Sequence, residues 1–332
     1  MNARFTTLVD RALDTTIVPG FSRIGYATRS RLFGWPRDQY DLRGRVIVIT
    51  GATSGIGLAA ARRFAAAGAT IELLARDADK ATRVVHELFA HSPFGVGIVV
   101  ADMGDLDAVQ AAADSLAARH AAIDVLIHNA GALDNNYATA PDGTEQTVAS
   151  QVLGPFLLTT LLQEHLRAAA PSRVLWVASG GMYSEPLAVE HLEMRPHEYN
   201  GTKAYARAKR AQVTIAGEFA HRFAGDGIVV HAMHPGWADT PGVARSLPTF
   251  RKVAGPLLRS ADEAADTLVW LAADDGDPLA VTGGFWHDRR KRPIHKLPST
   301  RASDTTEERM RLWEWCEARI KAHLPAVGAA DE

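Results

Sequence analysis

The chain has 332 residues, of which 47% are hydrophobic and 22% are charged, a globular balance that excludes a disordered or fibrous protein. Lysine and arginine number 36 against 38 acidic residues, and the resulting net charge of −2 lacks the basic excess that is typical of nucleic-acid-binding proteins. A lone cysteine, Cys316, excludes an internal disulfide, and no apolar run approaches the roughly 18 residues needed to cross a bilayer. We therefore expect a cytoplasmic globular protein.

Residues 1–41 are predicted to form an N-terminal amphipathic extension. Residues 1–43 carry seven arginines against four acidic residues, and Phe5, Leu8, Val9 and Ala12 recur at helical spacing. A basic amphipathic helix can make a peripheral contact with an anionic membrane surface. It can also pack on its own domain or on a partner subunit, an alternative that the short apolar stripe favours.

Residues 42–288 alternate between apolar runs and helical patterns. The runs predict strands at residues 45–50, 70–75, 97–101, 125–128, 173–178 and 228–233. Helices are expected at 58–67 and 144–166, and Ser260 with Glu263 forms a capping-box pattern that opens another. The alternation predicts the α/β class, with a single Rossmann-type doubly wound parallel sheet and helical extensions at both termini. The C-terminal extension, residues 289–332, begins with a basic run and ends in a helix from about residue 307 to 323.

A glycine-rich turn follows the first predicted strand directly and leads into a helix. Its candidate cofactor-binding residues are Gly51, Ser54, Gly55, Ile56 and Gly57. Glycine is needed there because a side chain would block the tight turn and the approach of a pyrophosphate. The unpaired N–H groups and positive dipole end of the following helix favour that phosphate. The strand–turn–helix context therefore predicts a dinucleotide site.

Two further residues bear on the cofactor. The second predicted strand ends at Ala75 and is followed by Arg76, and an arginine at this tip accommodates the 2′-phosphate of NADP, whereas a carboxylate there favours NAD. The sequence thus favours NADP over NAD, with a plain surface arginine as the alternative. Asp102, after the third strand, can reach the adenine amine or cap the helix that starts near Asp105.

More motifs follow in chain order. They are Asn129, Ala130 and Gly131 after the fourth predicted strand, Ser179 after the fifth, two YxxxK matches at Tyr199–Lys203 and Tyr205–Lys209, and Pro235, Gly236 and Thr240 after the sixth. Together with the glycine turn, this order resembles the short-chain dehydrogenase/reductase family over residues 42–288. The stretch from Ser179 to Thr240 is similar to the dehydrogenase/reductase member 12 group, which itself resembles the retinol-dehydrogenase-like enzymes.

The second YxxxK match is the better candidate for catalysis. Tyr199 is followed by Asn and Gly, which are poor helix formers, whereas Tyr205 and Lys209 lie in a strong helical run. Residues four apart share one helix face, and a nearby cation favours the phenolate and lowers the pKa of a tyrosine toward neutral pH. We therefore expect Tyr205 and Lys209 to act together, with Tyr199 in a loop or at the pocket rim.

The resemblance implies roles for these residues. Tyr205 would exchange a proton with the substrate oxygen, Lys209 would lower its pKa and hold the nicotinamide ribose, and Ser179 would bind the substrate oxygen. The segments at 129–131 and 235–240 would line the cofactor. Gln151 stands where the family usually has an asparagine in its proton relay. Its side chain carries the same amide as asparagine but is one methylene longer. Gln151 can therefore either maintain the proton relay or interrupt it.

The sequence thus predicts an NADP(H)-dependent oxidoreductase that interconverts an alcohol and a carbonyl on a small hydrophobic substrate of lipid, retinoid or steroid type. The alternative is a dinucleotide-binding regulator or scaffold that has lost catalysis. The 13 histidines show no zinc-site spacing, so no metal is expected. No nucleic-acid partner is expected either, and a homo-oligomer stays open.

Overall fold

The computed structural model describes residues 3–36, 39–89 and 95–325. Residues 1–2 and 37–38 of the predicted N-terminal extension and residues 326–332 of the predicted C-terminal extension lie outside the described residues. Within them the strands form one eight-stranded sheet of order β3-β2-β1-β4-β5-β6-β7-β8. The strands are β1 Val46–Thr50, β2 Thr70–Ala75, β3 Val96–Val100, β4 Val125–His128, β5 Ser172–Val177, β6 Ile228–Met233, β7 Gly284–His287 and β8 Arg290–Lys291. Neighbouring strands from β3 through to β7 pair in parallel, and β8 pairs antiparallel with β7.

The order of the strands reverses between β1 and β4. The chain runs outward from β1 to β2 and β3, and then returns to build β4 to β7 on the other side. In such sheets ligands bind in the crevice beyond the carboxyl ends of the strands, at this switch point. The predicted α/β, Rossmann-type fold is confirmed, and the expected strands agree with the structure to within about one residue at each end.

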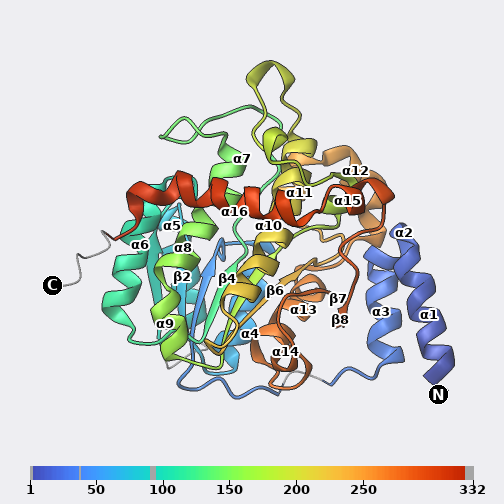
Figure 1. Ribbon diagram of the computed structural model, residues 1–332. Helices are drawn as coiled ribbons and strands as arrows, with labels where there is room; N and C mark the ends of the chain where they lie inside the picture. Colours follow the sequence, from blue (N-terminus) through green and yellow to red (C-terminus); the bar gives the residue numbers. More distant parts are fainter. Residues whose placement is uncertain (1–2, 37–38, 90–94, 326–332) are drawn as a thin grey trace.

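Helices cover both faces of the sheet (Figure 1). One face carries α4 Gly55–Ala66, α5 Ala78–Phe89 and α13 Ala261–Ala273. The other carries α6 Leu106–Arg119, α8 Gly154–Leu161 and α10 Gly201–Arg222. Shorter helices are α7 Gln146–Val148, α9 Gln163–Ala168, α11 Pro241–Ser246, α12 Pro248–Ala254 and α14 Asp277–Ala280. Strands covered on both faces are apolar throughout, which is why the hydrophobic runs located them.

The expected helix over 144–166 is wrong as one continuous element. It is divided into α7, a π-helical turn at Ala149–Leu153, α8, which ends at Leu161, and α9, which begins at Gln163. Pro155 follows the π-helical turn and has no N–H to donate back into it. The predicted capping box is confirmed, since Ser260 and Glu263 each bond the other's backbone N–H at the start of α13.

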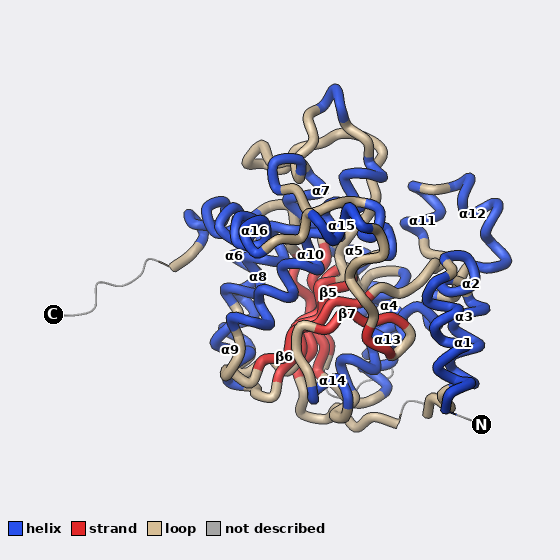
Figure 2. Tube along the Cα trace, turned by 45° about the vertical axis from the view of Figure 1, so that its right-hand side comes forward, coloured by secondary structure: helices blue, strands red, loops and turns tan. Residues whose placement is uncertain are grey.

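Both terminal extensions pack on the sheet domain. Helices α1 Ala3–Thr15, α2 Ile17–Phe21 and α3 Arg23–Leu32 lie together beside the β7–β8 edge (Figure 2). After α15 Pro298–Ala302, α16 Thr306–Ile320 lies across α10, and its Trp313 packs against Phe156 and Phe219 at ring distances of 4.7 and 4.8 Å. In the part of the chain that the structure describes, no helix has the length and apolar character to cross a membrane.

Candidate active site

The glycine turn after β1 lies against the loop after β4. Gly51 has a φ of +69°, and a Cβ atom there would lie 2.8 Å from the Cα of Ala130. Gly55 has a φ of +56°, and its Cβ position faces Thr240 at 3.3 Å. Only glycine suits such conformations at such close approach. The two glycines therefore let the turn lie directly against the loops after β4 and β6.

The start of α4 is open for an anion. Exposed Ser54 precedes the first helical residue, Gly55, and its side chain does not cap the helix. The first N–H groups of this 12-residue helix are therefore available to a phosphate beside Gly55 and Ile56, as a dinucleotide requires. Gly57 is packed under the side-chain amide of Asn129, so a larger residue there would displace that amide.

Asn129 holds the turn in shape. Its Nδ2 donates to the carbonyl oxygens of Thr50 and Gly51 at 3.0 and 3.1 Å. In return, the Thr50 hydroxyl accepts the backbone N–H groups of Asn129 and Ala130 at 3.0 and 2.9 Å. The ends of β1 and β4 are thereby joined, and Asn129 serves the crevice by shaping the turn.

Arg76 lies exposed directly after β2. The neighbouring carboxylate of Asp77 is already engaged, because it accepts the Lys80 N–H at 2.9 Å and pairs with the Lys80 ammonium at 3.1 Å. These contacts hold the pKa of Asp77 below its usual range. The guanidinium of Arg76 is therefore the charged group next to the strand tip that can meet a ligand.

Asp102 closes a turn after β3. Its carboxylate accepts the N–H of Gly104 at 2.8 Å. The helix-capping alternative for Asp102 is wrong, because Asp105 is the residue that caps α6, accepting the N–H of Ala108 at 3.1 Å.

Ser179, Tyr205 and Lys209 converge at the carboxyl end of β5. Ser179 follows β5 and accepts the Gly181 N–H at 3.2 Å, and its side chain interacts with that of Tyr205. Tyr205 and Lys209 lie one turn apart on α10, with the Lys209 Nζ 5.4 Å from the centroid of the Tyr205 ring. Burial raises the pKa of Tyr205, and the hydrogen bond with Ser179 lowers it in part.

Lys209 is buried among neutral partners. Its Nζ donates to the Val177 carbonyl oxygen and to the Gln212 Oε1, both at 3.0 Å. Burial lowers its pKa from 10.5 to about 7. The lysine is therefore only partly charged at neutral pH, and an anionic or polar ligand that solvates its ammonium would raise that pKa.

Gln151 points into the same place from the π-helical turn. Its Nε2 donates to the Ala132 carbonyl oxygen at 2.7 Å, while its buried Oε1 has no partner among the described residues. A Cβ on Gly131 would lie 2.9 Å from this Oε1 and 3.1 Å from the Lys209 Nζ. Gly131 thus leaves room where the two polar groups meet.

Sequence reasoning missed Gln212. Its Oε1 accepts from Lys209, and its Nε2 donates to the Gln151 carbonyl oxygen at 2.6 Å. The amide therefore joins α10 to the π-helical turn. The sequence does contain a signal for this role, because Gln212 is a polar residue between apolar neighbours, three positions after Lys209 and on the same helix face.

The first YxxxK pair lies elsewhere. Tyr199 precedes α10, donates to the Asp134 carbonyl oxygen at 3.1 Å and lies 3.2 Å from the Thr147 hydroxyl. Lys203 is exposed, and the helix begins after Asn200, which caps it. Tyr199 and Lys203 are therefore not brought together with Ser179.

The turn after β6 closes the crevice. Gly236 has a φ of +80°, and the Pro235 carbonyl oxygen accepts from Arg259 at 3.1 Å. Thr240 caps α11 by accepting the Val243 N–H at 3.2 Å, which leaves its methyl group against Gly55. The predicted cofactor residues of the first and last loops are thus neighbours.

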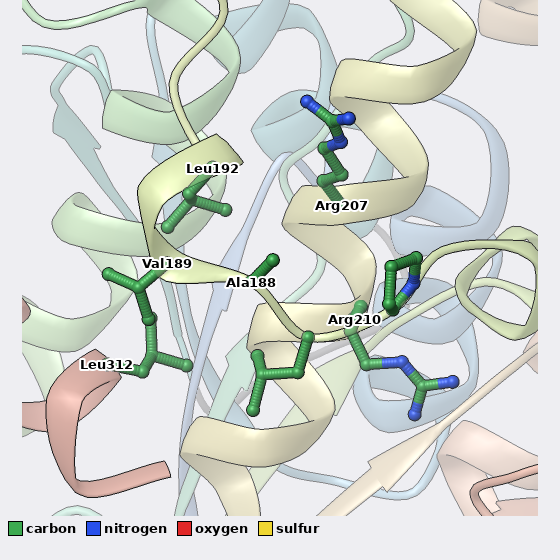
Figure 3. A pocket seen from close by; sticks show the side chains of 8 residues that line it. Ala188, Val189, Leu192, Arg207, Arg210 and Leu312 are labelled. Carbon is green, nitrogen blue, oxygen red and sulfur yellow. The ribbon is translucent and has the colours of Figure 1, made fainter. Parts of the chain in front are cut away.

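The hollow in Figure 3 lies on another side of α10. It is lined by Pro186, Leu187, Ala188, Val189, Leu192, Arg207, Arg210 and Leu312. The Arg210 guanidinium donates there to the carbonyl oxygens of Met182, Glu185 and Ile294 at 2.8, 3.2 and 2.9 Å. Arg210 therefore tethers the loop after Ser179 beside this hollow, which lies apart from Ser179, Tyr205 and Lys209 in its lining.

Comparisons with known proteins identify the family of the chain. A family model described as short chain dehydrogenase matches residues 45–249. Dehydrogenase/reductase SDR family member 12 from Bos taurus is 34% identical over 298 residues, covering 90% of this chain and 93% of the relative. Retinol dehydrogenase 12 from Homo sapiens is 32% identical over 281 residues, covering 83% and 86%. The crystal structure of an uncharacterised protein from Mycobacterium Paratuberculosis has a TM-score of 0.68 and 26% identity, covering 86% of this chain and 97% of that one. The chain therefore belongs to the short-chain dehydrogenase/reductase family of NAD(P)-dependent alcohol and carbonyl oxidoreductases.

Proposed function

We propose that this protein is an NADP(H)-dependent oxidoreductase that interconverts an alcohol and a carbonyl on a hydrophobic substrate of lipid, retinoid or steroid type. The observation that carries the proposal is the convergence of Ser179, after β5, with Tyr205 and Lys209, one turn apart on α10, together with the open N-terminus of α4. The name of the retinol dehydrogenase relative supports a hydrophobic alcohol as substrate.

Each residue of the set has a chemical role in this proposal. Tyr205 gives a proton to the carbonyl oxygen during reduction and takes it back during oxidation. Ser179 donates a hydrogen bond to that oxygen and holds it next to the phenol. The bound nicotinamide supplies or accepts the hydride. Lys209 binds the ribose and, once charged, favours the phenolate of Tyr205.

The test is NADPH oxidation with a panel of lipid aldehydes and ketones. Tyr205→Phe is expected to lower kcat by about 10²- to 10⁴-fold, because it removes the proton donor. Tyr199→Phe is the matched control, since it removes a hydroxyl that binds Asp134 and Thr147 outside the site, and it should turn over like wild type. Equal rates for wild type and Tyr205→Phe would overturn the catalytic assignment.

The preference for NADP rests on Arg76, with the neighbouring Asp77 occupied by Lys80. Arg76→Ala is expected to weaken NADPH binding about tenfold or more and to leave NADH binding unchanged, since only NADPH carries the 2′-phosphate. Titration of wild type and Arg76→Ala with NADPH and with NADH measures this difference. An equal loss for the two cofactors would remove the argument for NADP.

A second candidate function is a dinucleotide-binding regulator without catalysis. It is favoured by the unpartnered Oε1 of Gln151 and by the neutral partners that hold the Lys209 ammonium. This alternative predicts NADPH binding with no turnover of any substrate in the panel. Gln151→Asn would then be expected to restore turnover, and activity in the wild type would exclude the alternative.

A further inference from the structure

Phe21, at the end of α2, lies directly behind the catalytic loops. The residue is 5% exposed, and its ring packs edge-on against His234 and His287 at 4.4 and 5.5 Å. A Cβ atom on Gly180 would lie 2.7 Å from this ring. Gly180 immediately follows Ser179, so the ring of Phe21 fixes the backbone next to the serine.

The backbone of Phe21 supports the second loop. Its carbonyl oxygen accepts the Trp237 N–H at 2.8 Å. A Cβ atom on Gly236 would lie 2.6 Å from the same oxygen, so the turn is seated closely on Phe21. One residue of the N-terminal extension thus touches both the loop after β5 and the loop after β6.

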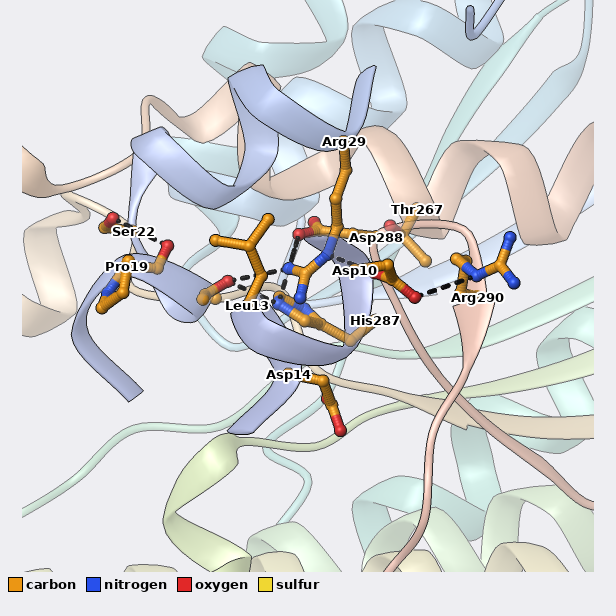
Figure 4. Close-up of polar contacts among 12 residues, drawn as sticks. Asp10, Leu13, Asp14, Pro19, Ser22, Arg29, Thr267, His287, Asp288 and Arg290 are labelled. Atoms are coloured by element: carbon orange, nitrogen blue, oxygen red, sulfur yellow. Dashed lines mark hydrogen bonds and ion pairs between the residues drawn. The ribbon is translucent and has the colours of Figure 1, made fainter. Parts of the chain in front are cut away.

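A buried ionic network holds this extension in place (Figure 4). Fully buried Arg29 of α3 bonds Asp10 of α1 at 2.8 Å and Asp288, at the end of β7, at 2.7 Å. Arg259 also bonds Asp288, at 2.6 and 2.9 Å. The same guanidinium reaches the carbonyl oxygens of Ser22 and Pro235 at 3.2 and 3.1 Å. Residues on both sides of Phe21 are therefore tied to the turn that Phe21 supports.

We propose that Phe21 is a positioning residue for catalysis, and that α1–α3 form a fixed backing that sets the Ser179–Gly180 and Pro235–Trp237 loops. The inference rests on the proposed function of that site. Removing the ring leaves space behind Gly180 and His234, and the adjoining loops can shift into it. Displacement of an orienting group by about 1 Å can cost about 100-fold in rate.

The experiment compares Phe21→Ala with Phe223→Ala. Phe223 is also buried, but it lies just beyond the far end of α10, about 27 Å along the helix from Tyr205. Both variants lose one buried ring, so thermal stability is expected to fall in both. Only Phe21→Ala should weaken NADPH binding and lower kcat, each by about tenfold or more, because only its ring backs the catalytic loops. If Phe21→Ala does not fold, the same measurements are made on Phe21→Leu.

A double-mutant cycle tests the contact itself. Gly180→Ala places a Cβ against the Phe21 ring and is expected to lower kcat alone. Adding Phe21→Ala makes room for that Cβ, so the double variant should lose much less than the product of the two single effects. If the loss of kcat in the double variant equals the product of the two single losses, the inference is overturned.

Two outcomes separate the inference from the proposed function. Wild-type NADPH affinity and kcat in folded Phe21→Ala or Phe21→Leu would overturn the positioning role and leave the oxidoreductase assignment standing. Absence of NADPH binding in the wild type would overturn both.

Discussion

Burial of Lys209 predicts an unusual dependence of stability on pH. Its pKa in the folded protein is about 7, against 10.5 for an unperturbed lysine. Between these values the unfolded chain binds the proton and the folded protein does not, so raising the pH stabilises the folded state. Each pKa unit corresponds to about 1.4 kcal/mol, and the full penalty well below pH 7 is about 5 kcal/mol.

The measurable quantity is the difference between two pH values. From pH 7 to pH 9, the cost of burying Lys209 falls by about 2 kcal/mol. Lys209→Met keeps the apolar stem and removes the titration, so it should lack this gain. The hydrogen bonds that it loses to Val177 and Gln212 are a separate cost, which largely cancels when the two pH values are compared.

Urea unfolding followed by tryptophan fluorescence at pH 7 and pH 9 provides the assay. Lys203→Met, which removes an exposed lysine of the same helix, is the control and should follow wild type. Contributions of all other titrating groups are shared by the three proteins and drop out of the comparison. The same pH dependence in wild type and Lys209→Met would refute the reasoning.

Three further outcomes are expected. Asp10→Asn should lower the free energy of unfolding by about 3–5 kcal/mol near neutral pH, because it breaks a buried pair with Arg29. Burial opposes ionisation of Asp10, but its arginine partners lower its pKa below the usual value. The stability difference between wild type and Asp10→Asn should therefore shrink as the pH falls below about 4, and a difference that stays constant would contradict this. Gln212→Leu removes an acceptor of the Lys209 ammonium and should cost about 1–3 kcal/mol of stability and lower kcat; an unchanged kcat would assign Gln212 to packing alone. We also propose that the exposed face of α1, which includes Leu8 at 66% exposure, contacts anionic membranes. Leu8→Asp should then reduce flotation with phosphatidylserine vesicles, and equal flotation of both proteins would exclude this contact.

Local patterns in the sequence were sufficient for most of the sheet. Strands buried on both faces are continuous apolar runs, and six of them were located in that way. Strand β7 was missed because Gly284–His287 has glycine and histidine at its ends and no β-branched residue, unlike the equally short β4. Strand β8 was missed because it has only two residues, and both are charged. The π-helical turn was missed because the apolar pattern runs through it without a break.

The glycine turn and the Tyr205–Lys209 spacing could also be recognised in the sequence, because each depends only on residues a few positions apart. The sequence predicted that Lys209 would lower the pKa of Tyr205. Burial instead raises the pKa of Tyr205 and lowers that of Lys209 before any ligand is bound. Desolvation depends on the packing of α10 against the sheet, which spacing along the chain does not encode.

Only the tertiary structure shows what surrounds these local motifs. Arg29 meets Asp288, and Phe21 meets Gly180, across long stretches of sequence. The sequence predicted an amphipathic helix at the N-terminus because helical periodicity is a property of neighbouring residues. Which surface that helix covers depends on how β5, β6 and β7 place their carboxyl ends side by side, and this arrangement exists only once the sheet has formed.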